Sequence, residues 1–226
     1  MSKFINESTY RYNSKTDSPA YAGYMYGSVI GTRENNIKNE VDSDIKQLLD
    51  SWYEDNLNFN SYENFIFDSG FCNDRSITTG TGEDVTTLTV FGANSRANNY
   101  TAALRCENKN GDLFTTSQSL YGNKSLKYPI GLPTYDELAF SGLNSDIANN
   151  LGWTFSSPGY WTMSPSWVDP TWQTVSAYKI LDDKIYFGYD LTWKYGVRPV
   201  ISLKSDVKIS SGIGTVNEPF VIDTNN

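Results

Sequence analysis

The order in which helical and strand patterns follow one another constrains the fold of this chain more than any other sequence feature. A stripe of apolar residues at helical spacing predicts a helix over 43–55. This stripe consists of Ile45, Leu48, Leu49, Trp52 and Tyr53. Thr134 followed three residues later by Glu137 forms a capping box, which predicts a second helix over 134–141. Strand patterns dominate after it, and helices followed by strands predict an α+β fold rather than a βαβ alternation.

Short strand candidates are distributed along the chain and are separated by long polar loops. They cover residues 21–27, 86–91, 102–106, 159–163, 175–180, 184–189, 197–203 and 220–222. A hairpin is predicted around the solvated turn Asp182-Asp183, for which a calcium site is the alternative. Pro199 lacks an amide donor, so it places the strand 197–203 at a sheet edge or a bulge.

The 226-residue chain contains no histidine. This absence excludes Ser-His-Asp and Cys-His nucleophile systems, His-ligated zinc sites and an imidazole general base. Carboxylates still leave an enzyme possible, and Asp136 with Glu137 is the candidate pair for a glycosidase. Because Glu137 serves the capping box of a helix, the favoured interpretation is a protein that is not an enzyme and needs no metal or cofactor.

The charge balance bears on the partners of the chain. There are 26 acidic and 18 basic residues, and the resulting net charge of −8 argues against nucleic-acid binding. No segment reaches the ~20 apolar residues that a membrane-spanning helix needs, and the polar start at 1–13 shows no signal peptide. We therefore expect contact with a membrane only through an anchor outside this chain.

Cys72 and Cys106 are the two cysteines of the chain, and neither belongs to a CxxC motif. Metal binding and thioredoxin-like redox chemistry are therefore poor interpretations. The two remaining alternatives are a disulfide and a pair of buried free thiols. An aromatic content of 15%, together with many Asn, Ser, Thr and Gly residues, is typical of loop-rich extracellular domains, which favours the disulfide and an extracellular or cell-surface location.

Two segments of the C-terminal third resemble a known signature. Residues 160–165 (YWTMSP) and 196–201 (GVRPVI) resemble the conserved motifs of C-type-lectin-like domains of the sulfatase-modifying-factor subtype, a fold shared by the variable proteins of diversity-generating retroelements. Four further segments resemble conserved motifs of a surface-protein family of gut bacteria. They are 71–75 (FCNDR), 128–132 (YPIGL), 211–215 (SGIGT) and 219–222 (PFVI). The likeness spans residues 40–222.

This resemblance implies a C-type-lectin-like fold with two helices packed on antiparallel sheets and long loops. Residues 41–226 would form that domain, and 1–40 would be an N-terminal extension with an early strand in the same domain. The chemistry of two subtypes does not transfer. No cysteine follows Cys106, so the cysteine pair of formylglycine-generating enzymes is missing, and the segments 172–174 (WQT) and 218–220 (EPF) lack ligands that calcium-dependent lectins use.

In this fold, the region between the two signature segments supplies the surface that faces the ligand. The candidate binding residues there are Trp167, Trp172, Tyr186, Tyr189, Trp193 and Tyr195. Their alternative role is packing of the core; we expect Trp167, Trp172 and Trp193 to be at least partly exposed. Trp161 and Arg198 are expected to be structural, Trp161 inside the core and Arg198 bound to a buried carboxylate or to backbone carbonyls.

The predicted function is that of a non-enzymatic adhesion or ligand-binding domain, displayed on a bacterial or phage surface, that recognises a protein or a glycan through these aromatic loops. A structural or tip subunit of a pilus or phage tail is the first alternative. A carboxylate-based glycosidase is the second.

Overall fold

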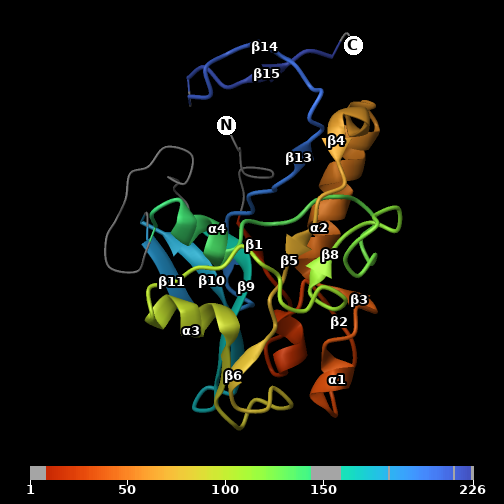
Figure 1. Cartoon of the computed structure of the whole chain (residues 1–226). Coiled ribbons are helices and arrows are strands. Elements are labelled where there is room, and N and C mark those ends of the chain that lie inside the picture. Colours follow the sequence, from red (N-terminus) through yellow and green to blue (C-terminus); the bar gives the residue numbers. More distant parts are fainter. Residues whose placement is uncertain (1–8, 144–158, 183, 216, 225–226) are drawn as a thin grey trace.

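The computed structural model describes residues 9–143, 159–182, 184–215 and 217–224 (Figure 1). Its fold is mixed α+β, with few helices and a curled antiparallel sheet, as the order of sequence patterns predicts. Figure 1 shows α2 along one side of the molecule, the long strands β9, β10 and β11 on the other, and the C-terminal hairpin above both. The finer assignment of the fold to the C-type-lectin-like group stays a prediction.

The helical elements are α1 (Arg33–Asn36), α2 (Asp44–Tyr53), α3 (Gly92–Asn98), α4 (Tyr135–Phe140), the 3₁₀-helices η2 (Pro19–Ala22) and η4 (Tyr62–Phe65), and the π-helix η3 (Glu54–Asn58). The strands are β1 (Tyr10–Arg11), β2 (Met25–Tyr26), β3 (Val41–Asp42), β4 (Ile66–Phe67), β5 (Phe71–Cys72), β6 (Ile77–Thr79), β7 (Thr89–Phe91), β8 (Leu113–Phe114), β9 (Tyr160–Asp169), β10 (Thr174–Leu181), β11 (Lys184–Asp190), β12 (Lys194–Tyr195), β13 (Ser202–Leu203), β14 (Ile209–Ser211) and β15 (Val221–Ile222).

One five-stranded antiparallel sheet is the largest sheet of the described structure. Its strand order is β11-β10-β9-β7-β6, and α3 and α4 both pack on β9. The other strands form two-stranded pairs, several of which join segments that are distant in the chain. β1 pairs with β12, β4 with β13, and β5 with β8. The N-terminal segment is thereby part of the same body as the C-terminal strands.

Helix α2 lies where its apolar stripe predicts. The hydroxyl of Ser43 accepts a hydrogen bond from the amide of Lys46 and caps the helix, as Ser does at helix starts. Ile45, Leu49 and Tyr53 are buried in the main core together with Trp161 of β9. Leu48 and Trp52, which complete the predicted stripe, are partly buried against the same cluster.

The capping box at the start of α4 is also confirmed. The hydroxyl of Thr134 accepts from the amide of Glu137, and the carboxylate of Glu137 accepts from the amide of Thr134. A second, smaller core forms between α3, α4 and the strands β9, β10 and β11. It consists of Ala93, Tyr135, Leu138, Leu143, Tyr160, Tyr178, Ile180 and Ile185.

Several strand predictions are wrong in type or extent. Residues 102–106 form no strand, because this segment is held by side-chain contacts and a disulfide rather than by a ladder. The predicted strand 21–27 begins in the end of the 3₁₀-helix η2, and only the short β2 within it is a strand. The Gly- and Asn-rich segment 92–98 is a helix despite its low helix propensity, since Ala93 packs into the second core.

The segment 197–203 was expected to be a strand at a sheet edge or a bulge, and only its end, Ser202–Leu203, is a strand. That strand pairs with β4 outside the central sheet, and Val200 makes an isolated bridge to Gly131. β9 in contrast is longer than predicted and runs through Pro165. The ladder to β10 is irregular on both sides of the Pro165–Ala177 pair, so a bulge accommodates the proline.

The segment 71–75 attaches the loops that contain Cys106 and Asp112 to the core. The Cys72–Cys106 disulfide is present, with an S–S distance of 2.06 Å, so the disulfide prediction is confirmed. Arg75 is buried and pairs with buried Asp112 at 2.7 Å between Nε and Oδ1, and its guanidinium also donates to the carbonyls of Met25 and Gly111. Each charged group is thereby compensated, which burial of a charge requires.

Removing the disulfide by Cys72→Ser and Cys106→Ser together should lower the free energy of unfolding by about 3–4 kcal/mol, because the bond closes a loop of 34 residues in the unfolded chain. Urea denaturation of the double variant and the native chain under oxidising conditions measures this difference. A loss below about 1 kcal/mol would contradict this role of the bond, because it would mean that closing the loop removes little entropy from the unfolded chain.

Candidate functional site

Trp172 and Trp193 are exposed, as expected of binding residues. Trp172 lies in the turn between β9 and β10 and is 77% exposed, and Trp193 follows β11 and is 54% exposed. The two side chains lie on separate turns, and neither lines the two cavities described below. The backbone of Tyr189 lies in β11, but its side chain is outside the described part of the structure, as is Asp183 of the predicted turn.

Trp167 is partly buried on β9 and contacts the neighbouring aromatic Phe187 of β11. The two rings meet edge to face with centroids 5.8 Å apart. Gly188 makes this approach possible, because it adopts a φ of +71° and a Cβ at this position would lie 2.8 Å from Nε1 of Trp167. Phe187 is itself 51% exposed, so the pair presents aromatic surface at the edge strand of the sheet.

Tyr195 and Tyr186 have a more structural setting. Tyr195 is partly buried, and its ring packs edge to face on Trp161 with centroids 5.0 Å apart. Lys179, which is fully buried, donates to the hydroxyl of Tyr195 and lies over its ring. Tyr186 is partly buried and pairs in register with Lys179. Tyr195 therefore supports the core instead of presenting an open binding surface.

The two residues predicted to be structural are both buried. Trp161 is fully buried, and its Nε1 donates to the carbonyl of Tyr10 at 2.9 Å, which satisfies its polar atom. The guanidinium of Arg198 lies 4.3 Å from the ring centre of Tyr160, and burial lowers the pKa of this side chain. A cation–π contact with an aromatic ring was not anticipated from the sequence.

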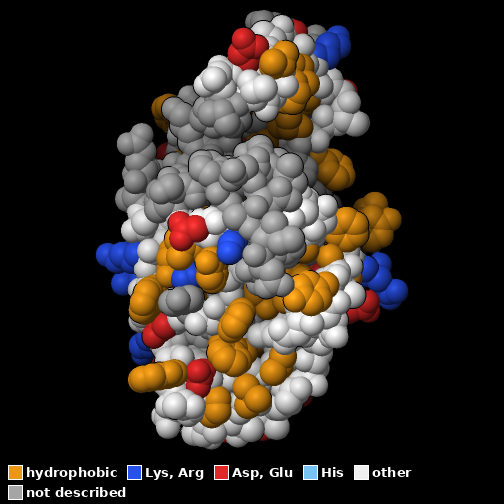
Figure 2. Space-filling view, turned by 90° about the vertical axis from the view of Figure 1, so that its left-hand side faces the viewer, with side chains coloured by type: hydrophobic (Ala, Val, Ile, Leu, Met, Phe, Trp, Pro, Cys, Tyr) orange, Lys and Arg blue, Asp and Glu red, His pale blue; other side chains and the backbone are white. Residues whose placement is uncertain are grey.

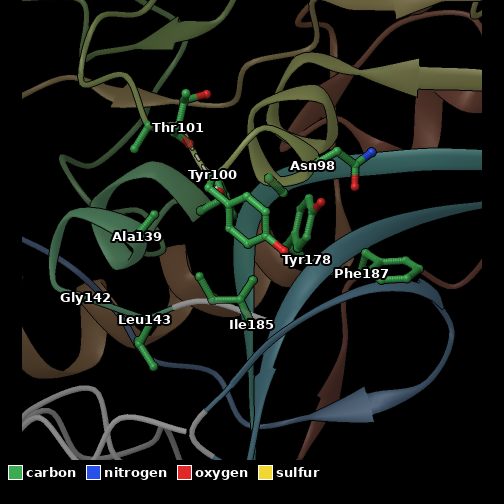
Figure 3. Close-up of a pocket in the computed structure, with 12 residues that line it drawn as sticks. Asn98, Tyr100, Thr101, Ala139, Gly142, Leu143, Tyr178, Ile185 and Phe187 are labelled. Atoms are coloured by element: carbon green, nitrogen blue, oxygen red, sulfur yellow. Dashed lines mark hydrogen bonds between the residues drawn. The ribbon is translucent and has the colours of Figure 1, made fainter. Parts of the chain in front are cut away.

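A cavity of about 240 Å³, which we call the aromatic pocket, lies beside Phe187 (Figure 3). It is formed by the end of α3 and the loop after it, by α4, and by strands β10 and β11. The aromatic side chains in its wall are Tyr100, Tyr135, Tyr178 and Phe187. Figure 3 shows Thr101 and Asn98 on one side of the pocket and Ile185 with Leu143 on the other. Figure 2 shows that hydrophobic side chains gather on the lower half of the face that holds β11 and α3.

The tyrosines of the wall are held in place by their neighbours. The hydroxyl of Tyr135 donates to the carbonyl of Thr101 at 3.2 Å, and its ring lies 5.1 Å from that of Tyr178. Burial raises the pKa of both hydroxyls, and the pKa of Tyr178 rises well above its ordinary value. Both phenols are therefore neutral at physiological pH, so they act as hydrogen-bonding groups and not as bases.

An ion pair positions the loop that carries Tyr100. Arg96 of α3 makes a bidentate contact with Asp136 of α4, at 2.6 Å and 2.7 Å, and a further ion pair with Asp74 at 2.9 Å. Asp136 also accepts a hydrogen bond from the amide of Ala103 at 2.9 Å. The bidentate geometry fixes direction as well as distance, so residues 96–103 are tied to α4 at both ends.

Tyr100 has an unusual backbone conformation for a bulky residue. Its φ is +53°, in the left-handed region that non-glycine residues rarely adopt, and its side chain is 72% exposed at the pocket. Such conformations cost free energy and cluster at binding sites. The ion pairs of Arg96 and the disulfide at Cys106 on either side of this loop supply the constraint that maintains it.

The pocket offers apolar contact and neutral hydrogen bonds. None of the described residues in its wall is charged, and the polar groups are tyrosine hydroxyls, the hydroxyl of Thr101 and the amide of Asn98. The sequence did not single out these residues, because they come from four separate segments whose proximity depends on the sheet. Tyr178 and Phe187 are the nearest exceptions, since both lie between the two signature segments, in the region that the sequence does single out.

No group of three or more Asp, Glu or Cys side chains within the described ranges could hold a metal ion. The described helices include none that is long and apolar enough to cross a membrane, and the disulfide is compatible with an extracellular location. Comparisons with protein-family models, curated proteins and solved structures found no match to this chain.

Buried Lys179 generates a prediction about pH. Burial lowers its pKa from 10.5 to about 8 in the folded chain, so between these values the unfolded chain binds more protons and the free energy of unfolding rises with pH. From about pH 7.5 to 9.5 we expect a gain of roughly 2 kcal/mol. Lys179→Met should flatten this rise in urea denaturation. Equal slopes for the two proteins in this window would contradict the role of Lys179.

Proposed function

We propose that this chain is a non-enzymatic ligand-binding domain that recognises a protein or a glycan through the aromatic pocket and the aromatic side chains beside it. The observation that carries the proposal is a pocket wall with four aromatic rings and no charged side chain among its described residues. Such walls provide large contact area and a few directing hydrogen bonds. The exposed ring of Tyr100 and the Phe187–Trp167 pair extend this surface beyond the cavity.

The chemistry of the pocket supports binding over catalysis. The candidate glycosidase residues are engaged in structural contacts, since Asp136 pairs with Arg96 and Glu137 completes the helix cap with Thr134. A glycosidase requires two carboxylates that face each other across space for a sugar. The phenols of Tyr135 and Tyr178 are neutral, so they would not act as bases in place of carboxylates.

The proposal includes a C-type-lectin-like fold and display at a cell or virion surface. Support comes from the segments that resemble that group. The segment 160–165 forms the buried start of β9, Arg198 of the segment 196–201 packs on it through Tyr160, and the segment 71–75 carries the disulfide. A disulfide suits an oxidising, extracellular setting.

One observation favours a second candidate function, that of a structural or tip subunit of a pilus or phage tail. The C-terminal hairpin of β14 and β15 stands above the rest of the chain in Figure 1 and exposes Ile213 and Phe220. Exposed apolar side chains on a short hairpin are suited to contact with another protein. This function is compatible with a binding pocket elsewhere on the molecule.

The proposal predicts which side chains carry binding. Glycan and host-protein arrays first identify a ligand of the intact chain. Phe187→Ala and Tyr100→Ala should then each weaken its binding by about tenfold or more, equivalent to ~1.4 kcal/mol, because each removes a ring from the pocket.

Phe59→Ala is the matched control, since Phe59 is an equally large, exposed residue outside both cavities and its loss should leave the affinity unchanged. Native-like affinity of the Phe187 and Tyr100 variants, with loss on Trp172→Ala, would move the site to the β9–β10 turn. Binding unaffected by any of the three substitutions would contradict an aromatic recognition site altogether.

A further inference from the structure

A groove of about 610 Å³ lies at the end of α2, between η4, β4 and the loop at 116–121. It shares no lining residue with the aromatic pocket. The polar residues and the exposed ring that matter for its chemistry are Glu63, Asp68, Gln118, Tyr121, Lys127 and Lys204. Its volume falls within the range of small-ligand sites.

Glu63 is the unusual member of this set. Its Oε2 atom is buried and accepts no hydrogen bond from the described residues. Burial, followed by the nearby charge of Glu63, raises the pKa of Tyr53 to about 12, so the neighbouring phenol is neutral. A buried acceptor without a donor costs free energy. Because the last torsion of a glutamate is soft and Glu63 lines the groove, a donor that enters the groove can reach its carboxylate.

The other charged groups of the groove already have partners. Asp68 accepts from the amide and the hydroxyl of Thr116, at 3.2 Å and 2.5 Å. Lys127 pairs with Glu54 at 3.4 Å and lies over Tyr128. These contacts fix the walls of the groove.

Lys204 donates to the carbonyl of Asn64 at 2.5 Å, next to Glu63 in the chain. Among the charged lining residues, this leaves the carboxylate of Glu63 with an unused acceptor. Gln118 is exposed and lines the same groove, so its side-chain amide is accessible to a ligand.

The backbone around the groove is irregular. α2 continues directly into the π-helix η3, and Ser61, two residues before Glu63, has a φ of +59°. Short π-helical segments and left-handed residues are found preferentially at functional sites, where tertiary contacts maintain them. They place η4, and Glu63 with it, at the edge of the groove instead of in line with α2.

We propose that this groove binds a neutral saccharide, with Glu63 accepting from sugar hydroxyls, Gln118 hydrogen-bonding to them and Tyr121 packing against the ring face. The charges in the lining favour a neutral ligand. A cationic ligand would be repelled by Lys127 and Lys204, and an anionic ligand would be repelled by Glu63 and Asp68. A neutral polyol can both donate to the carboxylate and accept from the amide.

The test is saturation-transfer NMR on the intact chain with glucose, galactose, N-acetylglucosamine and maltose, with glucosamine and glucuronate as charged comparisons. At least one neutral sugar should bind saturably, with a dissociation constant on the order of millimolar, and both charged sugars should bind more weakly. Glu63→Gln should weaken binding of the neutral sugar about tenfold, and Gln118→Ala should weaken it several-fold. Phe187→Ala, which alters only the aromatic pocket, should leave this binding unchanged.

Circular dichroism and the melting temperature establish whether the Glu63 variant is folded. If it is not, the Gln118 variant tests the proposal, because Gln118 lies on an exposed loop and its substitution should not disturb folding. Absence of saturable binding for all neutral sugars would overturn the proposal, as would stronger binding of a charged sugar. Loss on Phe187→Ala with native-like binding of both groove variants would assign the sugar to the aromatic pocket, which would uphold the proposed function and contradict this one.

Discussion

The buried side chain of Asn73 joins three parts of the chain that are distant in sequence, and the remaining structure depends on this junction. Its Oδ1 accepts from the amide of Tyr24 at 2.8 Å, and its Nδ2 donates to the carbonyl of Met163 at 2.6 Å. The backbone amide of Asn73 donates to the carbonyl of Asp112. An amide that satisfies buried backbone groups in this way cannot be replaced by an apolar residue without leaving those groups unpaired. With the disulfide at Cys72 on one side and the buried ion pair of Arg75 on the other, the segment 71–75 connects the N-terminal region, the core strand β9 and the long loop that includes Asp112.

The contacts of the segment 71–75, which together form a framework, extend to the aromatic pocket. Asp74 pairs with Arg96, Arg96 pairs with Asp136, and Cys106 anchors the far end of the loop that carries Tyr100. The loop has no ladder of its own, so these contacts are what hold its conformation. A binding site assembled on constraints of this kind is largely preorganised, which lowers the entropic cost of ligand binding. Under the proposed function, the disulfide therefore contributes to recognition as well as to stability.

Local sequence patterns predicted those elements whose structure depends mainly on interactions between residues close in sequence. The stripe of α2 and the capping box at Thr134 follow from periodicity and from the chemistry of helix termini. The helix at 92–98 and the loop at 102–106 were not predictable in this way, because tertiary contacts override the propensities of their residues. The candidate site shows the same limit. Exposure of Trp172 and Trp193 was foreseen, whereas the pocket also depends on Tyr100 and Tyr135, which lie near Tyr178 and Phe187 only because α3 and α4 pack on one sheet.

The central claim is that this framework presents the aromatic pocket as the recognition site of the domain. Amide chemical-shift mapping of the chain, titrated with a ligand found on the arrays, tests it most directly, since it reports every contact surface at once. We expect the largest shifts on the amides of Asn98, Tyr100, Thr101 and Phe187, which line the pocket. Shifts centred instead on the turns of Trp172 and Trp193, with those pocket amides unmoved, would contradict it.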